Sequence, residues 1–393
     1  MASGIAFAKG KRDSQLISDL EASDWDFTHS TNESDAHNIH PFPAKFIAEI
    51  PRKVFSFFSV PPGTAVLDPF AGSGTALLEA QRSGVDFVGV DLNPIAVLIS
   101  RVKTGGPIIG GVDTARNISA AAQKRLQSKH FTIPEIPRLG HWFQPDVAAA
   151  MSCITTEIEE LESNSKMKDF LSLCLSAITV RVSNQESETR YAALDKRLDP
   201  SDVFRLFEKS AASIAAKLQR SDTLFSRRTG IGNVIQSDAR EIGNIEMPPI
   251  SLVVTSPPYP NAYEYWLYNK YRMYWLGFDP IHVREREFGA RPHYVSSNGD
   301  TINDFLDQMI ATFEGTARHL IDGAYAVILV ASECTIRGQV HDLPARLEEA
   351  LRRISYKPLT QIKRRIPRTK KAFNPDIGSI ESETLLFLRW EGK

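Results

Sequence analysis

Two glycines and one aspartate in the first quarter of the chain have the spacing of a nucleoside-binding site. In the stretch "DPFAGSGT", Gly72 and Gly74 let the backbone approach a ligand closely, and the helix expected after them points free N–H groups at it. Asp91 follows about 20 residues later, at the end of a second expected strand, where a carboxylate accepts both hydroxyls of a ribose. Such turns also occur without a ligand, but the aspartate favours a nucleoside. The missing GxGxxG pattern argues against a nicotinamide dehydrogenase.

A proline pair ends another apolar run, in the stretch "ISLVVTSPPYPNAYEY". Because proline cannot donate to a sheet ladder, Pro257 and Pro258 could simply stop the strand before an aromatic helix that packs into the core. Alternatively, they form a stiff loop rich in acceptors at the carboxyl end of a strand, where open α/β sheets place their chemistry. These residues alone leave both interpretations open.

Taken together, "VLDPFAGSGT", Asp91 and "TSPPY" resemble the signature motifs of the amino-methyltransferases of DNA, enzymes that use S-adenosylmethionine to methylate exocyclic amines. The "SPPY" form is similar to the cytosine-N4 branch, whereas the adenine-N6 branch more often has Asp or Asn in place of Ser256. Upstream, "HNIHPFPAKFIAEIP" resembles the segment that closes over the methionine end of the cofactor. The resemblance covers about 30–100 and 230–390. It implies a class I methyltransferase-like α/β fold with a mainly parallel seven-stranded sheet.

The resemblance also implies a cofactor site. Asp91 would bind the ribose and Asp238 the adenine amine, although Asp238 could instead cap the next helix. The predicted cofactor-binding residues are Phe46, Asp68, Pro69, Phe70, Ala71, Gly72, Gly74, Thr75, Asp91, Leu92, Asn93, Asp238 and Ala239. His37 and His40 have HxxH spacing, but we expect no metal because no third ligand is apparent.

Four residues of the proline motif are the predicted catalytic group. An exocyclic amine is a poor nucleophile because its lone pair is delocalised into the ring. Acceptors aimed at its two hydrogens, the Ser256 hydroxyl and the Pro257 carbonyl, would favour a tetrahedral nitrogen that faces the sulfonium methyl. Pro258 would help to hold this geometry, and Tyr259 would offer a stacking face to a base flipped out of the duplex. A C5 methylation is disfavoured because it needs a cysteine beside a proline, which Cys153, Cys174 and Cys334 lack.

The sequence therefore predicts a site-specific DNA methyltransferase acting on cytosine N4. The alternatives are methylation of adenine N6, an RNA amino-methyltransferase, and a catalytically silent nucleic-acid binder. A cognate restriction endonuclease or another defence component is an expected partner. With a net charge of −1, DNA contacts must come from local patches. The first candidate patch, "KRRIPRTKK" at 363–371, could equally be a solvated face, and the second is the polar segment 283–294. The candidate contacts are Arg284, Arg286, Arg364, Arg365, Lys370 and Lys371.

Strand and helix patterns in the 393 residues position these motifs. Residues 1–35 are expected to form an N-terminal arm anchored by Trp25 and Phe27. Residues 36–103 and 230–393 are expected to form the methyltransferase domain. Apolar residues three and four apart predict a helical insertion over 104–229, a third candidate for DNA recognition. The composition is 42% hydrophobic and 24% charged, and no run of 18 apolar residues occurs, so we expect a cytoplasmic protein without a membrane span.

Overall fold

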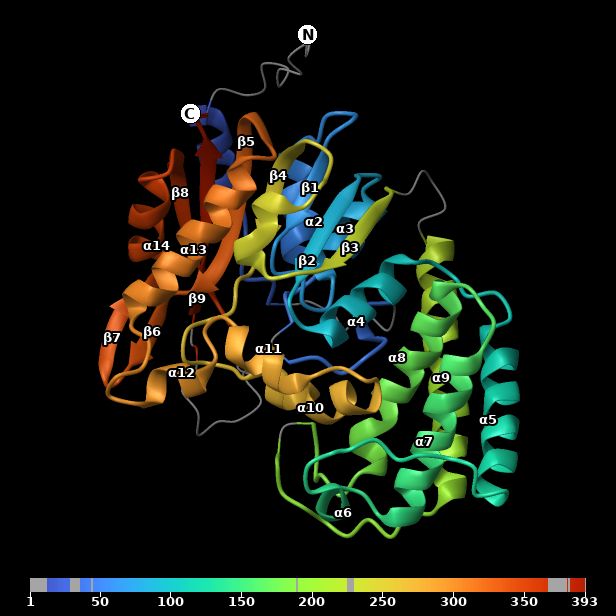
Figure 1. Ribbon diagram of the computed structural model, residues 1–393. Coiled ribbons are helices and arrows are strands. Elements are labelled where there is room, and N and C mark those ends of the chain that lie inside the picture. The colour runs from blue at the N-terminus through green and yellow to red at the C-terminus, as the bar shows by residue number, and fades with distance from the viewer. Residues whose placement is uncertain are drawn as a thin grey trace.

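The computed structural model describes residues 13–28, 36–43, 45–188, 190–224, 230–366, 380 and 382–392. Its centre is one seven-stranded sheet, formed by β1 (Ala65–Asp68), β2 (Phe87–Asp91), β3 (Gly232–Gln236), β4 (Ile250–Thr255), β5 (Leu320–Ala331), β8 (Tyr356–Arg365) and β9 (Ser382–Trp390). The spatial order is β3-β2-β1-β4-β5-β9-β8 (Figure 1). Strands β1 to β5 run parallel to one another. Strand β9 runs in the opposite direction between β5 and β8. The predicted class I methyltransferase-like sheet is confirmed.

Helices cover both faces of this sheet because side chains alternate along each strand. On β1, Val66 packs on one face, while Ala65 and Leu67 pack on the other. The first face is covered by α1 (Asp13–Glu21), α2 (Glu49–Phe57), α3 (Thr75–Arg82) and part of α4 (Pro94–Thr104). The second face is covered by the 3-10 helix η2 (Ala239–Asn244), α13 (Ile302–Ala317) and α14 (Leu343–Arg352). A further 3-10 helix, η1 (Ala36–Asn38), precedes α2.

Shorter elements complete the region around the sheet. After β4 come α10 (Tyr265–Trp275), α11 (Pro280–Arg286) and α12 (Arg291–Val295), and after β5 comes a hairpin of β6 (Glu333–Ile336) and β7 (Gln339–Asp342). The hairpin was not predicted from the sequence. Near the N-terminus, the expected anchor Trp25 is 3% exposed, stacks on Phe57 and packs edge-on against Phe387. Phe27 packs edge-on against Trp25.

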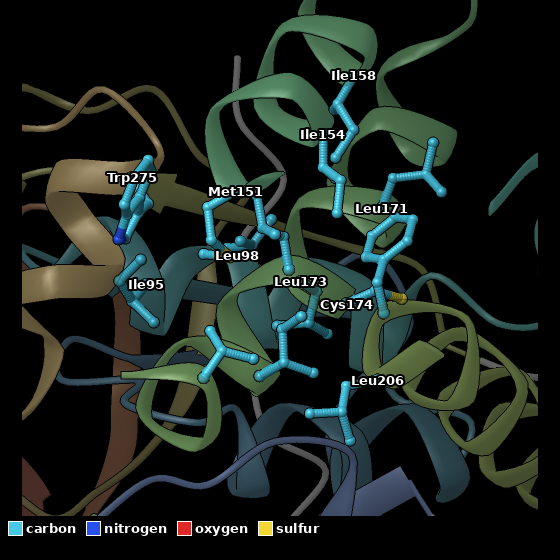
Figure 2. Close-up of a cluster of buried hydrophobic side chains, with 14 of the residues drawn as sticks. Ile95, Leu98, Met151, Ile154, Ile158, Leu171, Leu173, Cys174, Leu206 and Trp275 are labelled. Atoms are coloured by element: carbon cyan, nitrogen blue, oxygen red, sulfur yellow. The ribbon is translucent and has the colours of Figure 1, made fainter. Parts of the chain in front are cut away.

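A helical bundle separates α4 from β3 in the chain (Figure 1). It consists of α5 (Gly111–Gln127), α6 (Leu139–Trp142), α7 (Pro145–Glu160), α8 (Ser165–Val182) and α9 (Pro200–Leu224). Its apolar core is continuous with α4 and α10: Figure 2 shows Leu98 of α4, Met151 of α7, Leu173 of α8 and Trp275 of α10 in one cluster. The bundle is therefore built onto the helices around the sheet.

Both ends of this bundle meet at one residue of the sheet region. The Gln81 side chain donates to the carbonyl of Thr104, where the chain leaves α4, at 2.8 Å. The Gln81 carbonyl accepts from the backbone N–H of Gly230, where the chain returns, at 3.0 Å. Exit and return therefore lie side by side. Across the described residues, the structure has no helix long and apolar enough to cross a membrane.

Candidate active site

A cavity of about 520 Å³ lies at the carboxyl ends of β1 and β4. These neighbouring strands are the point at which the strand order of the sheet reverses, the usual ligand position in open α/β folds. The two strand ends are joined directly, because the Thr255 hydroxyl donates to Asp68 at 2.6 Å. The four predicted catalytic residues, Ser256, Pro257, Pro258 and Tyr259, line this cavity.

Most of the predicted cofactor residues line the same cavity. They are Phe46, Asp68, Pro69, Phe70, Ala71, Thr75, Leu92, Asn93, Ala239, Gly72, Asp91 and Asp238. Gly74 is the exception among the predicted set. It has a φ of +72°, and a Cβ there would lie 2.6 Å from the Ser100 hydroxyl oxygen, so glycine is required for the turn to pack on α4. The structure therefore assigns Gly74 to the shape of the turn and not to the cavity wall.

Asp91 organises the glycine turn as well as facing the cavity. One carboxylate oxygen accepts from the Gly72 N–H and the other from the Asn93 N–H, both at 2.8 Å. The Asn93 carbonyl oxygen caps α4 by accepting from Ile95, while its buried amide nitrogen has no partner within the described structure. An unpaired buried donor in a cavity wall costs free energy unless a ligand accepts from it. Asn93 thus offers a hydrogen bond to a polar ligand beside Asp91.

The interior of the cavity is acidic. Burial raises the pKa of Asp68 to about 7 and that of Asp91 to about 6, and it holds the pKa of Glu287 well above its usual range. Glu287 caps α10 by accepting from the N–H groups of Tyr265 and Trp266. Ligand charge can relieve this strain, because a positive group favours the ionised carboxylates. S-adenosylmethionine, with its sulfonium and ammonium groups, fits such an interior.

Asp238 satisfies both interpretations of the sequence in part. It lines the cavity, but it also caps η2 by accepting from the Arg240 N–H at 3.0 Å. Its oxygens further accept from the Arg240 and Arg286 guanidinium groups. Burial would raise the pKa of Asp238, but the hydrogen bonds from Arg240 and Arg286 outweigh burial and lower it. These contacts occupy the acceptor positions of the carboxylate, so the expected bond to an adenine amine would have to displace one of them.

Cations predicted to bind DNA fall into different environments. Arg364 is 3% exposed, forms an ion pair with Glu383 in the cavity wall and donates to the Trp25 carbonyl at 2.9 Å. It is therefore unavailable to phosphate, which corrects the prediction. The reason is that alternate positions of β8 face inward, as the exposed Arg365 next to it shows.

The other predicted cations also divide. Arg286 is occupied by Asp238 and Glu241. Among the described residues, the Arg284 side chain has a single ion-pair contact, with Glu285 at 3.7 Å, and it lies over the Trp266 ring at 5.6 Å. Lys370 and Lys371 fall outside the described residues. Of the predicted DNA-binding set, Arg284 and Arg365 are therefore the described cations still available to a polyanion.

Sequence reasoning missed several residues of the cavity wall: Lys45, Glu188, Tyr263, Tyr265, Glu287, Phe288 and Glu383. Lys45 donates to the carbonyls of His37 and His40, and its pKa is lowered to about 8, mainly by burial. It lies inside the "HPFPAK" segment, so its charge next to two prolines was a usable signal. Glu383 and Glu188 reach the cavity from the last strand and from the helical bundle, and no local pattern predicts that.

The HxxH pair serves the structure. His37 contacts Glu79 at 2.7 Å, and His40 contacts the Ser176 hydroxyl at 2.9 Å. Within the described ranges, no group of three His, Cys, Asp or Glu side chains is placed to hold a metal ion. The two histidines instead connect η1 and the residues after it to α3 and α8.

The chain is similar to several known methyltransferases. The chain is 23% identical over 256 residues to the Type II methyltransferase M.MvaI of Kocuria varians, covering 59% of this chain and 55% of that protein. It is 34% identical over 86 residues to M.MjaII of Methanocaldococcus jannaschii, covering 20% of this chain and 16% of that protein. It is 23% identical over 281 residues to M.BsoBI of Geobacillus stearothermophilus, covering 63% of this chain and 54% of that protein. The chain thus spans about half the length of M.MvaI and M.BsoBI.

A family model named N6_N4_Mtase and described as DNA methylase matches residues 8–101, which contain the glycine turn and Asp91. Fold and family together imply S-adenosylmethionine as the cofactor. Because the family name covers both N6 and N4 methylation, the match supports the coarser form of the prediction, an amino-methyltransferase of DNA.

Proposed function

We propose that the chain is a site-specific DNA methyltransferase that uses S-adenosylmethionine to methylate the exocyclic N4 amine of cytosine. One observation carries the proposal: the proline motif and the glycine turn with Asp91 line a single cavity at the switch point of the sheet. A methyl donor and a base amine could therefore meet without a large movement of either strand end.

The described residues supply binding and orientation. S-adenosylmethionine supplies an electrophilic methyl group on a sulfonium. Asp91 lines the cavity and would bind the ribose, while the acidic interior formed with Asp68 and Glu287 favours a cationic ligand. Ser256 lines the same cavity, where its hydroxyl and the Pro257 carbonyl would accept from the two amine hydrogens. Accepting both hydrogens localises the nitrogen lone pair toward the methyl group.

A base inside a duplex cannot reach this enclosed site, so the proposal requires base flipping. Tyr259 lines the cavity and is 9% exposed, with its hydroxyl held by Glu383 at 3.0 Å. A ring held at its far end is a rigid stacking surface. The fixed ring position needed for stacking would come from that hydrogen bond, while the ring face supplies the contact with the base.

A second group of cations lies on α10 and α11, which reach the cavity, and just before α6. Lys270 of α10 lies 6.0 Å from the Trp266 ring centre, over the same ring as Arg284. Arg138, exposed just before α6, lowers the pKa of Lys270 together with burial and Arg284, so the three charges are neighbours. Arg138 and Lys270 form no ion pair within the described part of the chain. Crowded cations fit a phosphate backbone, and among the described residues only Arg284 of the three contacts a carboxylate, Glu285 at 3.7 Å, so we assign DNA contact to this surface.

Nucleoside mass spectrometry tests the proposal. Purified protein is incubated with S-adenosylmethionine and duplex DNA, and N4-methylcytosine is the expected product. N6-methyladenine as the sole product would replace the cytosine assignment with the adenine alternative. Methylation of RNA but not of duplex DNA would favour the RNA amino-methyltransferase, and no methylated nucleoside in either would leave a silent binder.

The relatives M.MvaI and M.BsoBI are named Type II methyltransferases. We extend this to a cognate restriction endonuclease as partner, which a linked nuclease activity would support.

A further inference from the structure

A chain of hydrogen bonds runs along the cavity wall from a buried arginine to the proline motif. Arg364 of β8 donates to one carboxylate oxygen of Glu383 on β9. The other Glu383 oxygen accepts from the Tyr259 hydroxyl at 3.0 Å. The Tyr259 oxygen in turn lies 3.5 Å from the Ser256 hydroxyl oxygen. All four residues line the cavity.

Each bond in this chain has one possible direction. Arginine can only donate, and a carboxylate paired with it can only accept. Burial, with the Glu383 charge beside it, holds the pKa of Tyr259 well above its usual range, so the phenol keeps its proton. Tyr259 therefore donates to Glu383. Its only hydrogen is then used, and toward Ser256 it can only accept.

A preferred direction at Ser256 follows. The Tyr259 oxygen can accept the Ser256 hydroxyl hydrogen, which leaves the lone pairs of the Ser256 oxygen for a ligand. At 3.5 Å this last contact is longer than a strong O–H···O bond, so it biases the rotation of the hydroxyl and does not lock it. Such contacts often shorten when a substrate is bound. The bias matters because a hydroxyl can otherwise donate as readily as it accepts.

The Arg364 side chain is held by further hydrogen bonds, so this end of the hydrogen-bond chain is fixed in position. Besides Glu383, it donates to the Trp25 carbonyl at 2.9 Å and to the Asp26 carbonyl at 3.3 Å. These carbonyls belong to the segment after α1, which packs against β9 through Trp25, while α1 itself packs on β8. The N-terminal segment, the last two strands and the proline motif thus share one network.

We propose that Glu383 and Arg364 are positioning residues that hold the Ser256 hydroxyl as an acceptor, so that the site selects a base bearing an amine over one bearing a carbonyl at the same position. The inference rests on the proposed function. Cytosine offers two N–H donors at position 4, whereas uracil offers a carbonyl oxygen there. An oriented acceptor attracts the first and repels the second.

Glu383→Gln tests this directly. The glutamine carbonyl would accept from Arg364, leaving its NH₂ to donate to Tyr259. Tyr259 would then donate to Ser256, and the direction of the chain would reverse. Glu391→Gln is the matched control, because Glu391 is exposed just beyond β9 and pairs with Lys357 at 3.4 Å. Binding is measured to duplexes with cytosine or uracil at the target position, and kcat is measured on the cytosine duplex.

We expect Glu383→Gln to reduce the preference for cytosine over uracil at least tenfold and to lower kcat roughly 10- to 100-fold, with the KM for S-adenosylmethionine unchanged. The cost of flipping a mismatched base cancels when variant and wild type are compared on the same two duplexes. In a Ser256→Ala background, Glu383→Gln should have almost no further effect on kcat. The control should match the wild type in every measurement.

An unchanged base preference in Glu383→Gln, or losses that add to those of Ser256→Ala, would overturn the proposal. If thermal melting shows that Glu383→Gln does not fold, Tyr259→Phe replaces it, since it breaks the chain but keeps the ring and the Arg364–Glu383 pair. The same loss of base preference is then expected, and an unchanged preference would refute it. A wild type that prefers cytosine in binding but methylates no base would instead count against the proposed function alone.

Discussion

At the scale of single residues, the buried carboxylates of the cavity determine how the protein responds to pH. Asp68 has a pKa of about 7 and Asp91 of about 6, both above the ordinary 3.8, because burial disfavours their charged forms. In the ligand-free protein, these groups bind protons more tightly when folded than when unfolded. The stability that they contribute is complete below about pH 4 and is lost as pH rises through their folded pKa values.

We therefore predict that the contribution of Asp68 and Asp91 to the free energy of unfolding of the ligand-free protein falls between pH 4 and pH 7, while the affinity for S-adenosylmethionine rises over the upper half of that range. The cationic ligand favours the ionised carboxylates, so binding should release protons near pH 6.5. Urea titrations and calorimetry in buffers of different ionisation enthalpy measure the two effects. Asp68→Asn should make both the unfolding free energy and the cofactor affinity depend less on pH. A pH dependence as steep as that of the wild type would contradict the raised pKa of Asp68.

Asp91→Ala should weaken cofactor binding by roughly 1.5–3 kcal/mol, the cost of one charge-assisted contact to the ribose. It should also lower the melting temperature, because Gly72 and Asn93 lose the acceptor of their N–H groups. Asp91→Asn retains one carbonyl oxygen, so its cofactor affinity and its melting temperature should lie between those of the wild type and those of Asp91→Ala. Calorimetry on folded protein separates the effects, and full affinity in Asp91→Ala would remove this residue from the site.

Asp238 calls for a comparison of two readouts. Its alanine variant loses the cap of η2 and leaves Arg240 and Arg286 without their shared carboxylate, so we expect a loss of about 1–3 kcal/mol in stability. Because the carboxylate is already occupied, cofactor affinity should fall by less than in Asp91→Ala. A larger loss of affinity at Asp238 would show that the ligand displaces an arginine.

At the scale of elements, α10 connects the proline motif with the helical bundle. Arg272 of α10 is 2% exposed, donates to the Ser176 carbonyl of α8 and pairs with Glu188, which reaches the cavity. We predict that Arg272→Ala lowers stability by about 2–4 kcal/mol, since it leaves buried acceptors unpaired. Hydrogen exchange should then increase in α8 and α10 before it increases in β1 and β4. Uniform exchange across the chain would mean that the bundle and the sheet unfold as one unit.

The elements also show what the sequence could predict. Strands β1, β2 and β4 and the turns after them follow from apolar runs ended by glycine or proline, which are local signals. Most of the cavity-lining residues that the sequence predicted lie in these turns. Glu383, Glu188 and Arg364 could not be placed, because their position depends on the register of the last strands and on the packing of α10. The basic run at 363–371 was predicted from charge alone, whereas alternation along β8 buries Arg364.

At the scale of the whole molecule, the surface of Arg138, Lys270 and Arg284 determines the predicted salt dependence. Replacing these three residues with Gln should reduce the slope of log affinity for DNA against log salt by roughly 2–3 units, at about 0.9 per phosphate contact. Arg346 and Arg352 of α14, with Arg353 just after it, form a control with the same change of charge. Filter binding or fluorescence anisotropy at several salt concentrations measures the slopes. An equal change of the slope in both variants would mean that the effect comes from net charge and not from contacts at this surface.

The Gln81 contacts with Thr104 and Gly230 bear on how such proteins could diversify. A segment whose two ends meet can be exchanged as one block, because its replacement leaves the sheet and its turns in place. A chimaera joined at these two points is expected to fold if the incoming block preserves the surface that packs on α4 and α10. Recombination could then replace more than a hundred residues of this protein in one event and leave the chemistry of the cavity in its original setting.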